Sequence, residues 1–564
     1  MSFNSKTDVP AARRVNARGV FVRYIELRWL AAVLGFSYSF AANAQLGGFA
    51  DGIAVGQVTE RTLAEISGLV SSRNNPGVIW IHNDRARDEI YAVGTDGQLF
   101  ATYNLGKEVA DMEDIAIGPG PVPELQYLYC GDIGDNPATR SNIRVYRAAE
   151  PAVYEYLAVN PLAEDFPIVE RFTFTYPDGK YDAETLMVDP WTGDVYIATK
   201  QFNFTRIYRA SRAQLFDGAT VTLVFELELN FHQVSSGDIS ADGREIILRQ
   251  ENFARVWRRN PGQTIAQALM SEPADVPVIG MPMEPNGEGV TFDGQGLGYY
   301  TISEGANPFI YFFARTNDPP SALAQVLIST GSSWNYLDKG SDQGTAWRGS
   351  GFSDAAWPLG RAQLGYGDDD QQTTISFGSD RDAKHPTVYF RKQLKVENAA
   401  AFGPLTMGLV YDDAIAVYLN GTEVLRRNLA PNARFNDVAL SSGGALENLW
   451  QTFAVTNLLR TGTNTVAVEV HRRSLSEGDL SFDLQLSAYP APTPIQFIGQ
   501  PRRIAAATIA LDFRGPVGAT VFIDRSFNLN QWSALASIVL TNGAASLTNN
   551  IGSGTPSCFF RLRE

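Results

Sequence analysis

A two-part pattern recurs five times between residues 65 and 315, and this repeat limits the possible folds more than any other feature. Each copy begins with an acidic or polar residue, a spacer and a second acidic or small residue, followed by an apolar strand, as in "DMEDIAI" (111–117) and "DAETLMV" (182–188). A strand that ends in polar residues follows, and after it comes an aromatic and basic strand. Successive copies start 46, 71, 53 and 51 residues apart.

A period near 50 residues is typical of β-propeller blades with four strands each. The strands are rich in β-branched and aromatic residues, and turns such as "TDGQ" and "WTGD" separate them. We therefore predict an all-β chain in which residues 45–325 form a five- or six-bladed β-propeller. The interval of 71 residues is long enough to hide part of a sixth blade, and the strand "GIAVGQV" (52–58) is placed to complete the last blade and close the ring.

Aligning the five copies arranges their acidic residues in two columns. The first column is Glu65, Asp111, Asp182, Ser235 and Asn286, and the second is Ser67, Glu113, Glu184, Gly237 and Glu288. Both columns should face the same way, because the side chains of a strand alternate between its faces. The innermost strands of a propeller line its channel, so these residues should meet at one acidic mouth.

Carboxylate oxygens without histidine or cysteine partners favour calcium or magnesium over transition metals. The proposed ligands of a Ca²⁺ ion are Asp111, Glu113, Asp182, Glu184 and Glu288. The strands that follow end in a further polar set, predicted to bind the ligand: Asp84, Asp132, Lys200, Arg249, Glu251 and Glu304. An alternative is open at this point, since repeated acidic residues can also serve only to bind loop amides and fix turns.

The N-terminal segment predicts export. A basic region precedes the short apolar run "WLAAVLGFSYSF" (29–40), and "AANAQ" follows it, which is the order of a secretory signal peptide spanning residues 1–44. The apolar run is too short to cross a bilayer, so no transmembrane segment is expected after cleavage. The mature protein should be extracellular, periplasmic or bound to the cell surface. A net charge of −15 argues against a nucleic-acid partner.

Residues 326–490 change in character and predict an antiparallel β-sandwich. The stretch "AIAVYLNGTEVLR" alternates apolar and polar residues on both sides of Asn420-Gly421, which is a hairpin signal. Together with "YFRKQLKV" and "NTVAVEVHRRSLSEGDLSFDLQL", it resembles the galactose-binding-like jelly-roll module of secreted bacterial proteins. Five aromatic residues are candidates for a sugar-stacking platform or, more often, for core packing: Trp334, Trp347, Trp357, Tyr366 and Trp450. The acidic run 368–370 is either a calcium loop or a solvated loop.

A proline-rich linker, "YPAPTPI", leads to a small β domain at residues 491–564. The stretch "DRSFNLNQWSALASI" and the closing "FFRLRE" resemble the fibronectin-like end modules of exported bacterial proteins. Such modules imply attachment to glycans, to a surface or to other proteins.

The repeat region resembles the secreted phytase and esterase-like propellers through the "MEDI" and "EGV" elements around Glu113 and Glu288. That resemblance implies calcium ions and a phosphate ester at the mouth, with Glu113, Glu184 and Glu288 as metal ligands and Lys200 and Arg249 on the phosphate. Ser67 and Gly237 interrupt the acidic column, and the blade number differs. Two functions follow as hypotheses: a module that binds a small molecule, glycan or phosphate ester with calcium, or a calcium-dependent phosphoesterase in which metal-bound water is the nucleophile.

Overall fold

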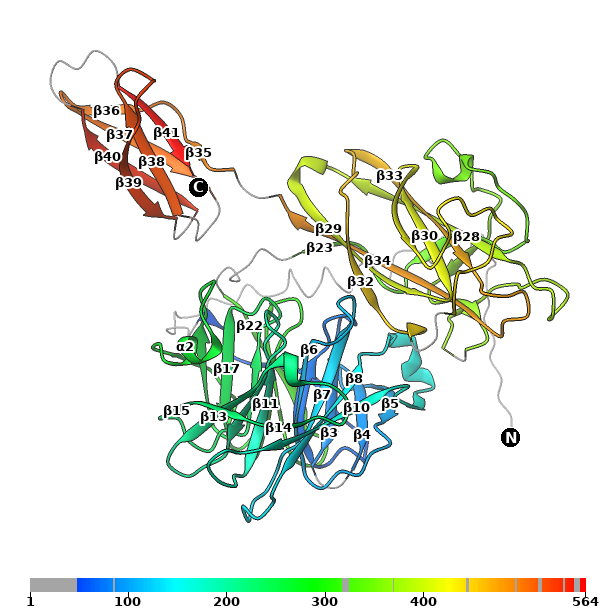
Figure 1. Ribbon diagram of the computed structural model, residues 1–564, viewed down its shortest axis with the longest axis horizontal. Helices are drawn as coiled ribbons and strands as arrows, with labels where there is room; N and C mark the ends of the chain where they lie inside the picture. Colours follow the sequence, from blue (N-terminus) through cyan, green and yellow to red (C-terminus); the bar gives the residue numbers. More distant parts are fainter. Residues whose placement is uncertain are drawn as a thin grey trace, which may run out of the picture. The chain divides into compact units, whose positions relative to one another are not determined.

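The computed structural model describes residues 48–84, 87–316, 324–368, 370–442, 446–491, 494–515, 520–540, 543–551 and 558–563 (Figure 1). The described chain is all-β, as predicted, and its helices are short: α2 (Ile265–Leu269) and the 3₁₀ turns η2 (Glu155–Val159), η3 (Arg212–Gln214), η4 (Ala346–Arg348) and η5 (Ala399–Ala401). The predicted signal peptide, residues 1–44, lies outside the described residues. Within the described parts, no helix is long and apolar enough to span a membrane.

Each copy of the repeat forms one antiparallel sheet of four strands. The first sheet contains β2 (Ile66–Ser71), β3 (Val78–Asn83), β4 (Glu89–Gly94) and β5 (Leu99–Asn104). The second contains β6 (Met112–Pro119), β7 (Gln126–Asp132), β8 (Ile143–Ala149) and β10 (Val169–Thr175). The third contains β11 (Ala183–Val188), β12 (Val195–Thr199), β13 (Thr205–Ala210) and β15 (Val224–Leu229).

The remaining two sheets follow the same plan. The fourth contains β16 (Ser236–Ile239), β17 (Glu245–Gln250), β18 (Phe253–Arg258) and β19 (Ala274–Val276). The fifth contains β20 (Gly287–Phe292), β21 (Gly298–Ser303), β22 (Phe309–Ala314) and, at its outer edge, β1 (Ile53–Gln57). The pairing of β1 with β22 confirms the prediction that the strand at 52–58 completes the last sheet.

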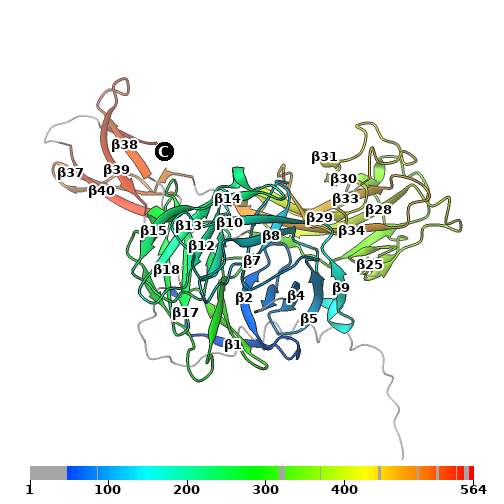
Figure 2. The same cartoon turned by 60° about the horizontal axis from the view of Figure 1, so that its bottom comes forward.

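The long interval between the second and third copies adds an edge strand instead of a sixth sheet within the described residues. This strand, β9 (Leu162–Asp165), lies parallel to β5 of the first sheet. A further edge strand, β14 (Thr220–Thr222), comes from the third copy and lies parallel to β10 of the second sheet. The order of the first sheet is β2-β3-β4-β5-β9, and Figure 2 shows β4, β5 and β9 side by side.

The first strands of the five sheets contact one another in sequence order: β2 with β6, β6 with β11, β11 with β16, β16 with β20, and β20 with β2. The five repeats therefore form a circuit with their first strands innermost. Apolar side chains fill the space between neighbouring sheets, as where Met187 and Ile207 of the third sheet pack with Ile246 and Leu248 of the fourth.

Two six-stranded sheets form the predicted β-sandwich in residues 325–490. One contains β23 (Gln325–Ile328), β26 (Leu364–Tyr366), β27 (Thr373–Thr374), β29 (Phe402–Tyr411), β32 (Gln451–Val455) and β34 (Leu480–Pro490). The other contains β24 (Ser333–Leu337), β25 (Leu359–Arg361), β28 (Thr387–Val396), β30 (Ala414–Leu419), β31 (Thr422–Arg427) and β33 (Gly462–His471). The predicted hairpin is confirmed as β30–β31, with positive φ angles of 55° at Asn420 and 86° at Gly421, as a tight two-residue turn requires.

The aromatic residues of the sandwich pack against other apolar side chains. Trp334 and Tyr366 lie in the core between its two sheets, Trp347 and Trp357 in a second apolar cluster, and Trp450 in the cluster of the first two repeat sheets. Trp334, Trp347, Trp450 and Tyr366 are buried, and Trp357 is half-buried against Phe352. The core interpretation is therefore confirmed, because a sugar-stacking platform needs exposed ring faces.

The C-terminal residues form two small sheets around one apolar cluster that includes Leu511, Phe513, Val521 and Ile523. The strands are β35 (Gln496–Phe497), β36 (Arg502–Ala505), β37 (Thr508–Arg514) and β40 (Ala544–Asn550) in one sheet, and β38 (Thr520–Ser526), β39 (Ser533–Val539) and β41 (Phe559–Arg563) in the other. These strands have an apolar cluster of their own, and the small fibronectin-like domain stays a prediction.

Candidate metal centre

Residues of the second acidic column lie at β-bulges that recur in the innermost strands. In four of the five innermost strands the pairing register shifts at the same place, between residues 66 and 68, 112 and 114, 183 and 185, and 287 and 289. The extra residues are Ser67, Glu113, Glu184 and Glu288. The strand β16 pairs with β17 in unbroken register, and there the column holds Gly237. Because a β-bulge redirects the side chain of its extra residue, the bulges explain why these carboxylates converge.

Three carboxyl groups form the tightest acidic cluster at this end of the innermost strands. Asp84 follows β3, Asp111 precedes β6, and Glu113 is the bulge residue of β6; one oxygen atom from each lies within 4.8 Å of the others. The hydroxyl of Ser67 donates a hydrogen bond to Glu113 Oε2 at 3.1 Å. The cluster thus joins the first two sheets.

A glycine makes room for these carboxylates. A Cβ atom on Gly134 would lie 2.4 Å from Glu113 Oε1 and 2.5 Å from Asp111 Oδ2. The backbone of the loop after β7 therefore lies directly against both side chains, and a larger residue would displace them.

The other predicted ligands surround a lysine. Lys200, at the end of β12, forms an ion pair with Glu184. Asp182 Oδ1 accepts a hydrogen bond from the backbone N–H of Asp135 at 2.8 Å. Attraction to Lys200 also acts on the pKa of Glu288, so these charges lie near one another. The site therefore combines a carboxylate cluster with cations beside it, namely Lys200, Arg140 near Asp111 and Arg249 near Glu288.

Burial and mutual repulsion raise the pKa values of the site carboxyl groups. Burial is the largest cause for Glu113, followed by the charge of Glu184, and together with nearby aspartates they raise its pKa to about 10. Burial also raises the pKa of Glu184 to about 8, although Lys200 opposes the shift, and that of Asp111 to about 6. Such carboxyl groups hold protons that a divalent cation can replace.

The pKa of Lys200 is raised as well, which for a lysine favours the charged form. Burial is the largest single cause and acts to lower this pKa, but the attraction and hydrogen bond of Glu184, together with the charges of Glu288 and Glu113, outweigh it. The lysine is therefore a permanent positive charge beside the cluster at neutral pH.

Two residues of the predicted ligand-binding set are buried inside the fold and held in ion pairs there. Asp132 is buried, accepts the backbone N–H of Asp111 at 2.9 Å and forms an ion pair with Arg140 at 2.9 Å. Arg249 is buried and forms an ion pair with Glu284 at 2.9 Å. We assign structural roles to both, because neither offers a free surface to a ligand.

The last two members of that set lie toward the surface. Glu251 is exposed, and its backbone carbonyl accepts a hydrogen bond from Arg249. Glu304 Oε2 accepts a hydrogen bond from Asn286 Nδ2 at 3.2 Å. Neither belongs to the three-carboxyl cluster, whereas Asp84, predicted for the ligand, does.

Glu284 and Gly134 are important residues that the repeat pattern did not indicate. Glu284 lies just before the fifth copy, outside both columns, and Gly134 lies two residues after Asp132, at a position that none of the aligned sets includes. No local pattern in the sequence indicates the role of Glu284, because its partner Arg249 is 35 positions away.

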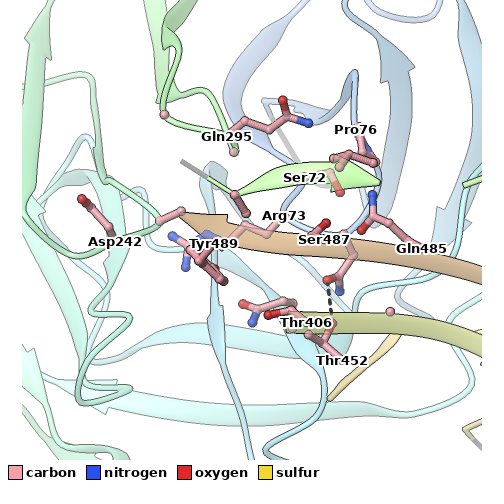
Figure 3. A pocket seen from close by; sticks show the side chains of 18 of the residues that line it. Ser72, Arg73, Pro76, Asp242, Gln295, Thr406, Thr452, Gln485, Ser487 and Tyr489 are labelled. Atoms are coloured by element: carbon pink, nitrogen blue, oxygen red, sulfur yellow. Dashed lines mark hydrogen bonds between the residues drawn. The ribbon is translucent and has the colours of Figure 1, made fainter. Parts of the chain in front are cut away.

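A cavity of about 440 Å³ lies at the opposite ends of the innermost strands (Figure 3). Ser72, which follows β2, and Gln295 line it together with Thr406, Gln485 and Tyr489. Arg73 reaches across to the carbonyl of Ile239, at 3.1 Å, at the end of β16. Ser72, Arg73 and Gln295 come from the repeats, and the other lining residues named here come from β29 and β34 of the sandwich. The sequence did not predict this cavity.

Comparison with known protein families and with curated proteins finds no match. Among solved structures, similarity is found to a Bacteroides uniformis β-glucuronidase (16% identity, TM-score 0.22, covering 43% of this chain and 28% of that one). A β-glucuronidase from an uncultured Clostridium sp. (13%, TM-score 0.21, 44% and 43%) and a glycosyl hydrolase family 2 member from Bacteroides cellulosilyticus DSM 14838 (12%, TM-score 0.21, 43% and 34%) are also similar. The chain spans less than half the length of each of these proteins.

Proposed function

We propose that the circuit of five sheets is a five-bladed β-propeller whose acidic mouth binds a ligand through a calcium ion. The observation that carries this proposal is the cluster of Asp84, Asp111 and Glu113, whose oxygen atoms lie within 4.8 Å of one another. Two oxygens bound to one calcium ion, each at about 2.3–2.6 Å, are at most about 5 Å apart. The cluster has the spacing that one calcium ion requires.

The ligand completes the coordination of this ion. Three carboxylates leave positions open in a shell of about six to eight oxygens, and Lys200 adds a positive charge beside them. Phosphate esters and the hydroxyl or carboxylate groups of glycans offer the oxygens that such a site accepts. The sandwich and the C-terminal domain then serve to attach the protein to glycans, a surface or other proteins.

Export fits this chemistry. Extracellular calcium modules work with dissociation constants of about 10⁻⁴–10⁻³ M, and the proposed secretion signal would deliver the protein to such an environment. We therefore expect weak calcium binding that is saturated outside the cell.

The phosphoesterase hypothesis is less favoured than binding. An enzyme of that kind needs cationic groups beside the metal to hold the phosphate, and it was expected to use both Lys200 and Arg249. Arg249 is buried in its ion pair with Glu284 and cannot reach a phosphate, whereas Lys200 is partly exposed. The mouth is thus better equipped to bind than to cleave.

Calorimetric titration with calcium tests the proposal. The variant Glu113→Gln/Glu184→Gln should bind one calcium ion fewer per chain than the unmodified protein, and Glu251→Gln should match the unmodified protein because Glu251 is exposed outside the cluster. Equal calcium binding by all three proteins would refute the site. Phosphate-ester turnover that disappears in the double variant would instead favour the hydrolase.

Gly134→Ala is expected to weaken calcium binding at the mouth by about 10–100-fold, as changes around metal ligands typically do. The new methyl group must push the carboxylates of Glu113 and Asp111 from their positions. Gly351→Ala is the control, since a Cβ there meets no atom within 4 Å. Unchanged affinity in Gly134→Ala would show that the two carboxylates do not hold the ion.

A further inference from the structure

A second acidic cluster lies in the β-sandwich, far from the repeats in sequence. Asp412 and Asp413 form the link between β29 and β30, and Glu447 precedes β32. One oxygen atom from each of the three lies within 4.8 Å of the others. Because β29 and β32 belong to one sheet and β30 to the other, the cluster stands where the chain passes between the two layers.

The burial of Asp412 gives an independent reason to expect a ligand. Its side chain is 3% exposed, and its Oδ1 atom is buried with no hydrogen-bond partner among the described residues. A buried carboxylate oxygen without a donor is costly and calls for an unobserved partner such as an ion.

The surroundings add negative charge. Asp368 and Asp479 act on Asp412 in the same direction as Asp413 and Glu447, and burial with these charges raises the pKa of Asp412 to about 9. Arg472 acts on Asp479 in the opposite direction, and its Nε donates to the carbonyl of His385 at 2.9 Å. The cluster therefore lies in a region where five carboxyl groups gather.

Backbone contacts fix the geometry of the cluster. Asp413 Oδ2 accepts the N–H of Arg473 at 2.6 Å, just after β33, and Asn428 Nδ2 donates to the carbonyl of Asp413 at 3.0 Å. On the side of the other layer, the backbone N–H of Asp412 donates to the carbonyl of Ser481 in β34 at 3.2 Å. The link that carries both aspartates is therefore held by both layers before any ion binds.

We propose that Asp412, Asp413 and Glu447 hold a second calcium ion, which joins the two sheets of the sandwich at this end. Ligands that are all carboxylate oxygens favour a hard divalent cation. The ion supplies the partner that Asp412 lacks and offsets the charge of the neighbouring aspartates. Its role is structural, and it does not depend on the site at the channel mouth.

The test uses the full chain in the Glu113→Gln/Glu184→Gln background, so that calcium binding at the mouth cannot be mistaken for this site. In that background, calorimetry with CaCl₂ should show one saturable calcium ion per chain and a rise in the thermal unfolding midpoint. Adding Asp412→Asn should weaken this binding by about 100-fold or more. Adding Glu423→Gln, a control on the exposed surface of β31, should leave it unchanged.

The outcomes separate clearly. No saturable calcium binding in the background protein, or binding that Asp412→Asn leaves unchanged, would overturn the proposal. If Asp412→Asn fails to fold by circular dichroism, Glu447→Gln replaces it, because Glu447 is only partly buried, and the same 100-fold loss is expected. If the channel mouth binds no calcium at all, the results expected here for Asp412→Asn and Glu447→Gln stay the same.

Discussion

Glu284→Gln is expected to lower the free energy of unfolding by about 3–5 kcal/mol, because it leaves the buried charge of Arg249 without a counter-ion. Both side chains are completely buried, and Arg249 Nη2 lies 2.9 Å from Glu284 Oε2. Glu284 Oε1 also accepts the hydroxyl of Thr301 at 2.8 Å. The pair links β17 of the fourth sheet to the segment before β20 of the fifth, so its loss should loosen that junction.

Asp275→Asn is the matched control for this effect. Asp275 pairs with Arg255 at 3.1 Å on the surface, with about half of the aspartate side chain exposed. Exposed pairs contribute about 0–1 kcal/mol. Urea unfolding should therefore separate the two variants by several kcal/mol, and similar losses in both would contradict the buried role of Arg249.

Glu113→Gln should have opposite effects with and without calcium. In EDTA it should stabilise the protein by about 1–3 kcal/mol at pH 7, because the fold must otherwise keep a proton on a carboxyl group whose pKa is raised from 4.5 to about 10. With calcium, it should remove the stabilisation that the ion provides, since a ligand is lost. The measurement is urea unfolding of both proteins in EDTA and in CaCl₂.

The sign of the pH dependence follows from the raised pKa. Between pH 4.5 and about 10 the unfolded chain has released the proton of Glu113 while the fold retains it, so the contribution of this group to stability is present at low pH and is lost as the pH rises. Glu113→Gln should flatten this fall in EDTA, and Glu251→Gln should keep it. A Glu113→Gln protein that is less stable than the unmodified protein at pH 9 in EDTA would contradict this account.

The repeat made the sheets predictable. A period near 50 residues with regular strand and turn signals indicated one four-stranded sheet per copy, and the position of the strand at 52–58 indicated that it completes the last sheet, as β1 does. Local turn chemistry was equally readable at Asn420-Gly421, because few residues other than Asn and Gly adopt positive φ angles without strain.

The candidate site was only partly predictable, since alignment shows which residues share a position but not what they contact. Asp111 and Glu113 lie together as expected. Arg249, by contrast, turns inward to Glu284, a partner outside the repeat pattern. The bulge that redirects Glu113 is a property of the pairing between β6 and β7, which no single strand reveals.

The second cluster illustrates the same limit. Asp412 and Glu447 are 35 positions apart in a segment with no repeated pattern, and only the folding of the sandwich brings them together. The run at 368–370 was the visible acidic signal, and of its members Asp368 lies beside the cluster and acts on Asp412.

An anomalous difference map from crystals grown with calcium tests the central claim most directly. The account predicts a calcium peak at about 2.3–2.6 Å from oxygen atoms of Asp84, Asp111 and Glu113, with open coordination positions on the side of Lys200. Ordered carboxylates at this mouth with no calcium peak among them, in crystals grown at saturating calcium, would contradict it.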